Sequence, residues 1–158
     1  MDDTVVDDTG LPERLAGRVI VLDPDGRVLL FEYDDPPPNG HHWNTPGGGL
    51  EPGEDYYAGA RRELAEETGW SDVPVLPEEI HRREIVMRHA KRRLVRQVER
   101  FYLARVAQPR RPLGDVGSMH AADGIDGARW WTAEELEATD QKIWPDGLPD
   151  LVRRHLAR

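Results

Sequence analysis

Three glutamates in one short segment are the residues best suited to chemistry. Glu63, Glu66 and Glu67 are spaced i, i+3 and i+4, so on a helix their carboxylates project within an arc of about 100° and over a rise of only ~6 Å. Like charges at this spacing destabilise a helix, and Arg61 and Arg62 offset only part of the repulsion. A divalent cation offsets it better, because Mg²⁺ takes carboxylate oxygens together with waters and phosphates. The spacing is therefore typical of a metal site, although a solvated acidic helix face has the same pattern.

The residues around the glutamates predict how they are held. Residues 55–68 carry apolar side chains at i, i+3 and i+7 and are predicted to form a helix with that stripe toward the core. The stripe consists of Tyr57, Ala60 and Leu64. Gly69 is placed to end the helix. Residues 43–53, with three glycines in a row, are expected to form a loop in front of it.

The remaining elements follow from periodicity and turn chemistry. Runs at 18–22 and 28–33, joined by a turn, predict a hairpin, and three consecutive prolines make residues 34–40 a loop. Further strands are predicted at 84–87, 94–106 and 129–132, and further helices at 133–138 and 150–157. Thr132 is the expected N-cap of the first of these helices, with Glu135 at N3. Interleaved strands and helices indicate an α/β or α+β class with a mixed sheet.

Length and composition limit the number of domains and the kinds of chemistry that are possible. A chain of 158 residues fits one domain, which we expect over residues 16–158 behind a mobile acidic tail at 1–15. There is no cysteine, which excludes disulfides, thiolate catalysis and Cys-ligated zinc and suits a cytoplasmic location. There is no secretory signal and no run of ~20 apolar residues, so no membrane association is expected.

The charge balance argues against a general nucleic-acid binder. The chain has 21 basic and 30 acidic residues, a net charge of −9, whereas nucleic-acid binding normally needs the opposite sign. Residues 82–100 are locally basic. This segment is either a patch that steers an anionic substrate or a hairpin with arginines on solvated faces.

The segment Gly48–Trp70 resembles the signature of the Nudix hydrolase family. That signature is Gly, five residues, Glu, seven residues, then Arg-Glu-aliphatic-any-Glu-Glu-any-Gly-aliphatic. The fixed positions are all matched, by Gly48, Glu54, Arg62, Glu63, Glu66, Glu67 and Gly69. A chance match is on the order of 10⁻⁸ per window. One position departs, since Trp70 replaces the final aliphatic residue, and the wider likeness covers roughly residues 16–155.

The resemblance implies a fold and an activity. The fold would be α/β, an α-β-α sandwich with a mixed β-sheet and a loop–helix–loop formed by the signature. The activity would be that of a metal-dependent pyrophosphohydrolase, which cleaves a phosphoanhydride bond of a nucleoside diphosphate linked to another moiety by attack of metal-activated water. Mg²⁺ is the implied cofactor, and Mn²⁺ can substitute for it.

The resemblance also implies roles for individual residues. The implied metal ligands are the backbone carbonyl of Gly48 and the side chains of Glu63, Glu66 and Glu67. One of these glutamates would double as the catalytic general base. Arg62 would pair with Glu54 and fix the loop against the helix, which supports the ligands from behind.

Four residues outside the signature are further candidates. Relatives often complete the site with another carboxylate whose position the signature does not fix. Glu99, Asp123 and Asp126 are candidates for that carboxylate, and Arg96 is a candidate for contacting the substrate. For each of them an ordinary solvated side chain is the alternative.

Other functions remain to be weighed. A Nudix-fold isomerase of isoprenoid diphosphates needs a catalytic cysteine, which this chain lacks. A non-catalytic nucleotide-binding sensor is the alternative to the hydrolase. The expected partner is a small-molecule, nucleotide-type diphosphate, with a preference for a nucleoside triphosphate or similarly compact compound because the chain is short. A homodimer is left open.

Overall fold

The computed structural model of the protein describes residues 10–89, 93–108, 110–111 and 125–156. The strands are β1 (Glu13–Leu22), β2 (Val28–Asp34), β3 (His41–Asn44), β4 (Gly47–Gly49), β5 (Val75–His89), β6 (Arg93–Arg105), β7 (Ile125–Trp131) and β8 (Lys142–Ile143). The helices are α1 (Tyr56–Thr68), α3 (Ala133–Ala138) and α4 (Leu148–Arg154). The strands form one mixed sheet in the order β5-β6-β1-β2-β3-β8, with β4 paired to β1 and β7 paired to β2.

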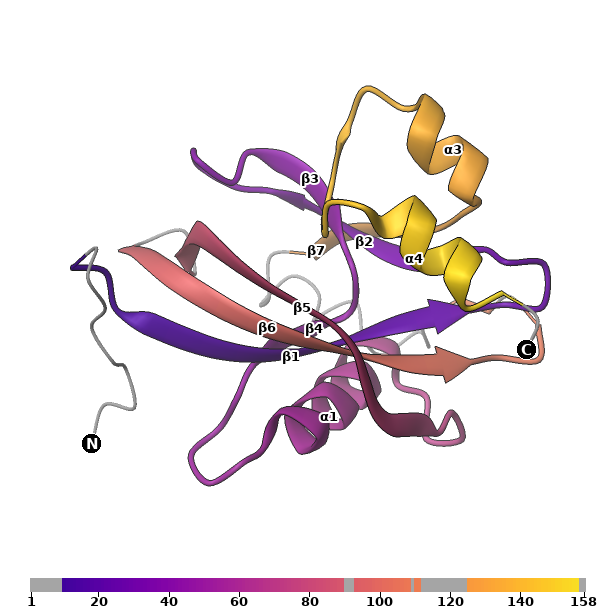
Figure 1. The fold of residues 1–158 in the computed structure, drawn as a ribbon, viewed down its shortest axis with the longest axis horizontal. Helices are drawn as coiled ribbons and strands as arrows, with labels where there is room; N and C mark the ends of the chain where they lie inside the picture. Colours follow the sequence, from indigo (N-terminus) through magenta and orange to yellow (C-terminus); the bar gives the residue numbers. More distant parts are fainter. Residues whose placement is uncertain (1–9, 90–92, 109, 112–124, 157–158) are drawn as a thin grey trace.

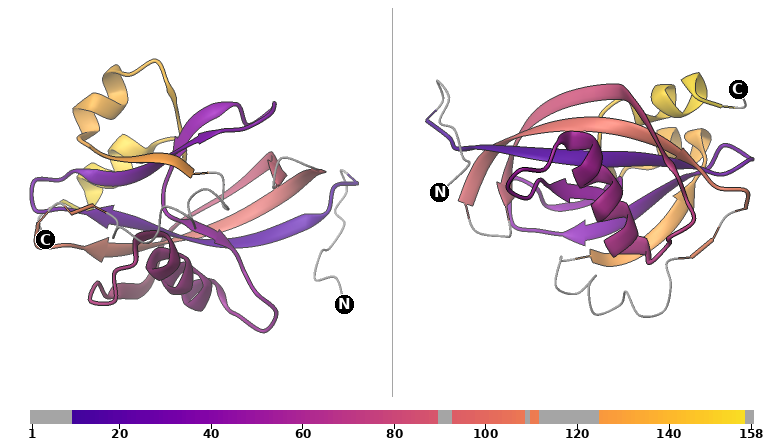
Figure 2. Two further views of the ribbon diagram at one scale, coloured as in Figure 1. Left: turned by 180° about the vertical axis from the view of Figure 1, so that it is seen from behind. Right: turned by 90° about the horizontal axis from the view of Figure 1, so that it is seen from below.

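Helices cover both faces of this sheet. α1 lies against one face, and α3 and α4 lie on the other (Figure 1), an arrangement that two further views confirm (Figure 2). Alternating residues of β1 feed the two cores, since Val19 and Val21 belong to the cluster that includes Leu64 of α1. Ile20 and Leu22 belong to the cluster that includes residues of α3 and α4. The expected α-β-α sandwich with a mixed sheet is therefore confirmed.

Local chemistry explains the limits of α1. The Asp55 side chain caps the N-terminus by accepting a hydrogen bond from Ala58 N at 2.7 Å. Gly69 ends the helix with φ +74°, a left-handed conformation that glycine adopts without steric cost. Ala60 and Leu64 are buried, as the apolar stripe predicted.

The close approach of α1 to β1 depends on Gly17. A Cβ atom at Gly17 would collide with the carbonyl oxygen of Tyr56 and would lie 2.8 Å from the backbone nitrogen of Ala60. Both are backbone atoms of the helix, so they cannot move aside as a flexible side chain would. Gly17 therefore sets the distance at which the glutamate-bearing helix sits on the sheet.

Several expectations for other elements are confirmed. β1 and β2 form the predicted hairpin, with Leu22 opposite Val28. α3 begins at a capping box made by Thr132 and Glu135. α4, predicted at 150–157, begins earlier, at Leu148.

Four further expectations about boundaries were wrong. β7, expected over 129–132, begins at Ile125 because it pairs with β2 as far as Tyr33. Residues 43–53 contain the second half of β3 and all of β4 rather than a continuous loop. Three glycines can pair with β1 because neighbouring side chains occupy the space of their missing Cβ atoms. β5, expected over 84–87, begins at Val75 because it pairs with β6 along nearly its whole length. β1 begins at Glu13, so residues 13–15 lie in the sheet, and residues 1–9 of the expected tail lie outside the described residues.

Across the described part of the chain, the model contains no helix with the length and apolar character needed to cross a membrane.

Replacing Gly17 with alanine is expected to destabilise the protein by about 1–3 kcal/mol, because the new methyl group must push α1 away from β1. The measurement is the midpoint of urea unfolding. Gly127→Ala is the matched control, since a Cβ there would meet the flexible Glu32 carboxylate at 3.1 Å rather than backbone. Equal midpoints for the two variants would contradict this account.

Candidate functional site

The carboxylates of α1 lie against the glycines of β4. A Cβ atom at Gly48 would come within 2.7 Å of the Glu63 carboxylate. Glu67 is buried, and its Oε1 accepts a hydrogen bond from Gly47 N at 2.8 Å. The predicted strip of glutamates therefore faces a strand without side chains, and Gly47, one residue before the predicted Gly48, makes the backbone contact with Glu67.

Arg62 joins the acidic residues of the site. Its guanidinium binds both oxygens of Glu54, at 2.8 and 3.0 Å, and donates to the carbonyl of Gly49 at 3.0 Å. It also donates to Glu63 Oε1 and to Glu66 Oε2, each at 3.1 Å. The expected pair of Arg62 and Glu54 is therefore present, and it ties α1 to the strand and loop in front of it.

The pKa shifts of this pair follow from its contacts. The hydrogen bonds to Glu54 raise the pKa of Arg62, and the same bonds lower the pKa of Glu54. Both groups therefore stay charged over the whole physiological range, which keeps the bidentate contact intact.

The donor set suits a hard divalent cation. Among the described residues, no three His, Asp or Glu side chains converge on a ready-made metal position. Arg62 holds Glu63 and Glu66 by hydrogen bonds of 3.1 Å. Mg²⁺ is commonly held by one or two carboxylates, with waters and substrate phosphates completing the shell, so the oxygens of these glutamates fit it.

Glu99 lies in a separate polar cluster on the other face of the sheet. It is fully buried on β6, and its two oxygens form ion pairs with Arg18 of β1 and Arg83 of β5. Gln97 also donates to Glu99 Oε2 at 2.7 Å. Burial acts to raise the pKa of Glu99, but the two guanidiniums outweigh it and lower the pKa to about 2. The structure thus shows this carboxylate as the counter-ion of two arginines.

The cluster continues along β1 toward β4. Arg18 donates to the carbonyl of Thr45 at 2.7 Å, and Arg14 donates to Gln97 Oε1 at 2.5 Å. A Cβ atom at Gly49 would collide with the Arg14 guanidinium. Arg14 therefore meets β4 at the residue next to Gly48, where Glu63 lies.

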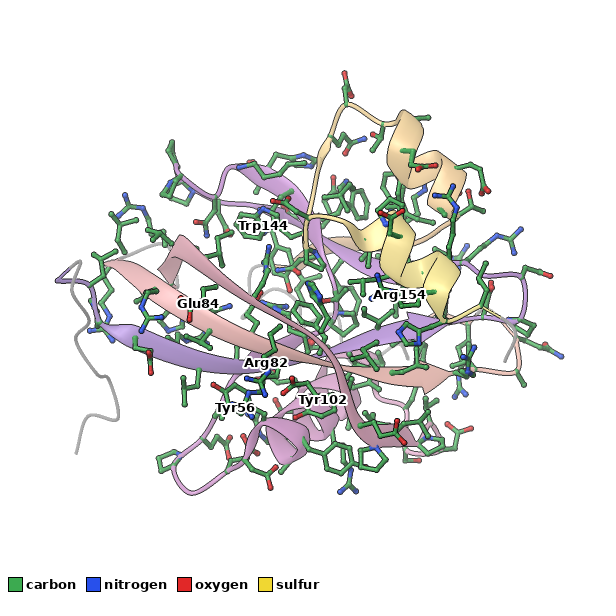
Figure 3. All side chains as sticks on the ribbon, viewed as in Figure 1. Tyr56, Arg82, Glu84, Tyr102, Trp144 and Arg154 are labelled. Carbon is green, nitrogen blue, oxygen red and sulfur yellow. The ribbon has the colours of Figure 1, made fainter. Side chains whose placement is uncertain are left out.

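Aromatic residues close the space above this cluster. His42 stacks on Tyr33 with ring centroids 5.2 Å apart and lies 4.1 Å from the ring centroid of Trp144. The Arg83 guanidinium lies 5.0 Å from the Trp144 ring. Figure 3 shows Trp144 on one side of the β5–β6 pair, with Tyr56 of α1 on the other. Burial lowers the pKa of His42 to about 4, so this histidine is neutral at pH 7.

Neither Arg96 nor Asp126 joins either cluster. Arg96 points to the α1 side of the sheet, where it pairs with Glu13 and with Glu84, the latter at 2.8 Å. Asp126 is exposed on β7. Asp123 lies outside the described residues.

Sequence reasoning did not single out Arg14, Arg18 or Gly47, and it gave Arg83 no role beyond the basic segment. The one usable signal was Arg18, a charged residue at the start of the β-branched run RVIVL. A charge at a buried position needs a partner, but that partner, Glu99, lies 81 residues away.

Replacing Glu99 with glutamine is expected to lower the free energy of unfolding at pH 7 by about 3–5 kcal/mol, because Arg18 and Arg83 lose a buried counter-charge. Urea unfolding measures the change. Glu134→Gln is the control, because Glu134 is exposed on α3 and only distantly paired, at 3.8 Å, with Arg153. A loss no larger than that of the control would contradict the pairing.

The same variant has a pH signature. The pKa of Glu99 lies at about 2, below its ordinary value of 4.5. Its contribution to stability is therefore complete above pH 4.5 and is lost as the pH falls toward 2. The difference in unfolding free energy between the wild type and Glu99→Gln should narrow across that window.

Comparison with known proteins adds independent information. The model of the NUDIX domain family matches residues 12–151. An RNA pyrophosphohydrolase of Caulobacter vibrioides is 48% identical over 59 residues, which cover 37% of this chain and 33% of that protein. The chain thus matches only about a third of that relative's length.

Solved structures agree on the fold. A MutT protein from Methanosarcina mazei has a TM-score of 0.65 at 18% identity, over 91% of this chain and 93% of that one. An Ap4A hydrolase from C. elegans has a TM-score of 0.61 at 19% identity, over 89% and 93%. The family model spans most of the chain, and α1 with its glutamates, the glycine strand β4 and Arg62 are all in place. This protein therefore belongs to the NUDIX domain family.

Proposed function

We propose that the protein is a pyrophosphohydrolase that uses a divalent metal to hydrolyse a phosphoanhydride bond in a nucleotide-type compound. The observation that carries the proposal is the set of three glutamates on α1 that face β4 and share Arg62. The retained signature supports catalysis over a sensor role, since every fixed position of the signature keeps its residue.

The residues of the site have different roles in the proposed reaction. Glu63, Glu66 and Glu67 would hold the cation through their carboxylate oxygens, together with a backbone carbonyl of the glycine strand. That carbonyl, expected at Gly48, is equally well supplied by Gly47, whose N–H already meets Glu67. Arg62 holds two of the glutamates and Glu54 in place, so it acts as a positioning residue.

The bond changes are those of hydrolysis. Water adds to one phosphorus, the anhydride P–O bond breaks, and a proton leaves the water for one of the three carboxylates acting as general base. Nudix hydrolases generally need a divalent metal, and we propose Mg²⁺, with Mn²⁺ as a substitute. When bound, the ion makes the attacking water more acidic and neutralises charge on the anhydride oxygens.

The names of similar proteins guide the choice of substrates to test. RNA pyrophosphohydrolase and Ap4A hydrolase are what those proteins are called, and both names imply cleavage within a phosphate chain. A useful panel therefore contains nucleoside triphosphates, Ap4A, nucleoside diphosphate sugars and a short RNA with a 5′ triphosphate. We prefer a compact small-molecule substrate, since the net charge of −9 opposes general binding of nucleic acid.

Replacing Glu67 with glutamine is expected to lower kcat by ~10²–10⁴-fold, because the variant loses a metal ligand or the general base. Release of phosphate or pyrophosphate from the panel is followed with Mg²⁺, with Mn²⁺ and with chelator. Activity should need the metal. Glu134→Gln, on α3, is the control and should retain wild-type activity.

Two outcomes would redirect the proposal. Cleavage that persists in chelator would remove the metal from the mechanism. If no compound is cleaved but one of them raises the melting temperature of the wild type, the intact site is used for binding, and the protein is a nucleotide sensor.

Replacing Arg62 with lysine is expected to lower activity by ~10–100-fold, because lysine keeps the charge but cannot reproduce the bidentate contact with Glu54. Arg61→Lys is the matched control, since Arg61 is the exposed neighbour on the same helix. The weakening should appear as a higher Mg²⁺ requirement, measured by titrating the metal. The positioning role is disproved if both lysine variants need the same Mg²⁺ concentration.

A further inference from the structure

Three arginines lie around Gln97 and Glu99 on the sheet face opposite α1. Arg14, Arg18 and Arg83 all project onto this face, and the side chains of Arg18 and Arg83 are 6% and 12% exposed. Both of these arginines share the single carboxylate of Glu99. No carboxylate among the described residues forms an ion pair with Arg14, whose guanidinium bonds to the neutral Gln97. Glu63 and Glu99 act on Arg14 electrostatically, but neither forms a direct ion pair with it. A partly buried cation that has no direct ion pair favours an anionic ligand.

Arg14 lies beside the proposed metal site. Its guanidinium sits at Gly49, and the Glu63 carboxylate sits at Gly48, the preceding residue of the same strand. The two groups are close enough for Glu63 to act electrostatically on Arg14. Only the backbone of β4 separates them, because neither glycine has a side chain. An anion can therefore extend from Glu63 around the edge of β4 to Arg14 without meeting a side chain of β4.

Arg93 extends the positive region, and His89 lies next to it. His89 ends β5 and Arg93 begins β6, and the two residues are paired in the sheet. Burial, then the charge of Arg18, lowers the pKa of Arg14 to about 10. Burial, then the charges of Arg14 and Arg93, lowers the pKa of His89 to about 4. Burial is the main cause of both shifts, and the neighbouring positive charges add to it.

We propose that Arg14, with Arg93 beside it, binds a phosphate group of the substrate that lies outside the reacting pair. This inference rests on the proposed function, because it treats the carboxylates of α1 as the place where the anhydride bond is cleaved. Two phosphates are engaged at that place. A third phosphate then lies across β4 at Arg14, so the preferred substrates carry three or more phosphates in a chain rather than two.

The first test measures anion binding without catalysis. The probe is inorganic tripolyphosphate, titrated calorimetrically into the full chain in the presence of chelator. Arg14→Gln should weaken binding by ~10-fold or more, because a charged donor to phosphate is lost. Arg14→Lys should recover part of it. In NMR spectra of the wild type, the probe should raise the pKa of His89 from about 4.

Arg82→Gln is the matched control. Arg82 is 65% exposed on β5, next to Arg83 in the chain but on the opposite face, where it pairs with Glu79 (Figure 3). This variant removes the same charge from another strand of the same sheet and should bind tripolyphosphate as the wild type does. If Arg14→Gln and Arg82→Gln bind the probe equally well, Arg14 is not an anion-binding residue and the inference fails.

The second test asks which substrate needs Arg14. With Mg²⁺, Arg14→Gln should raise KM for a nucleoside triphosphate by ~10–100-fold and change kcat by less than ~3-fold. KM for a nucleoside diphosphate sugar should change by less than ~3-fold, since such a substrate has no third phosphate. Melting temperatures of both arginine variants verify that they are folded.

The outcomes separate this inference from the proposed function. If no compound is hydrolysed but Arg14→Gln still weakens tripolyphosphate binding, the proposed function fails while the anion site stands. If Arg14→Gln raises KM equally for both substrate classes, Arg14 contacts the reacting phosphates themselves, and the preference for three or more phosphates is overturned.

Discussion

The glycine strand β4 is the constraint on which the rest of the site depends. Each of its three residues leaves room for a functional side chain: Arg18 at Gly47, Glu63 at Gly48 and Arg14 at Gly49. A Cβ atom at any of these positions would overlap with that side chain, so the strand can lie between the acidic helix and the basic sheet face only if it is bare. Glycine loses more backbone entropy on ordering than other residues. Pairing with β1 and the contacts of Glu67 and Arg62 offset this cost.

Arg62 reduces the repulsion between the carboxylates of α1. Carboxylates one turn apart repel each other, yet Glu63 and Glu66 both lie within hydrogen-bonding distance of a single guanidinium. The same guanidinium is anchored more tightly to Glu54, at 2.8 and 3.0 Å. Arg62 makes two hydrogen bonds to Glu54 but one each to Glu63 and Glu66. A divalent ion can therefore compete for these two glutamates while the anchor to Glu54 stays in place.

The two polar clusters beside β4 differ in their charge. On the α1 face, acidic side chains gather around one arginine, whereas on the other face two arginines gather around Glu99. Buried ion pairs of this kind often add little stability relative to apolar residues of similar volume. Their position beside β4, rather than in the middle of a core, accords with a role in the site. Trp144 and His42 shield the cluster from solvent and so strengthen its electrostatics.

The sequence by itself determined the local parts of this protein. The spacing of Glu63, Glu66 and Glu67, the apolar stripe and Gly69 were enough to predict α1, because contacts within a helix join residues a few positions apart. Strand pairing decided the rest. β1 runs parallel to β6, which brings Arg18 beside Glu99 across 81 residues, and the edge of β1 turned the glycine segment into a strand. The two-residue alternation of side chains along a strand shows which residues share a face of the sheet, but not which strand is the neighbour. The partners of Arg14, Arg18 and Glu99 could therefore come only from the tertiary structure.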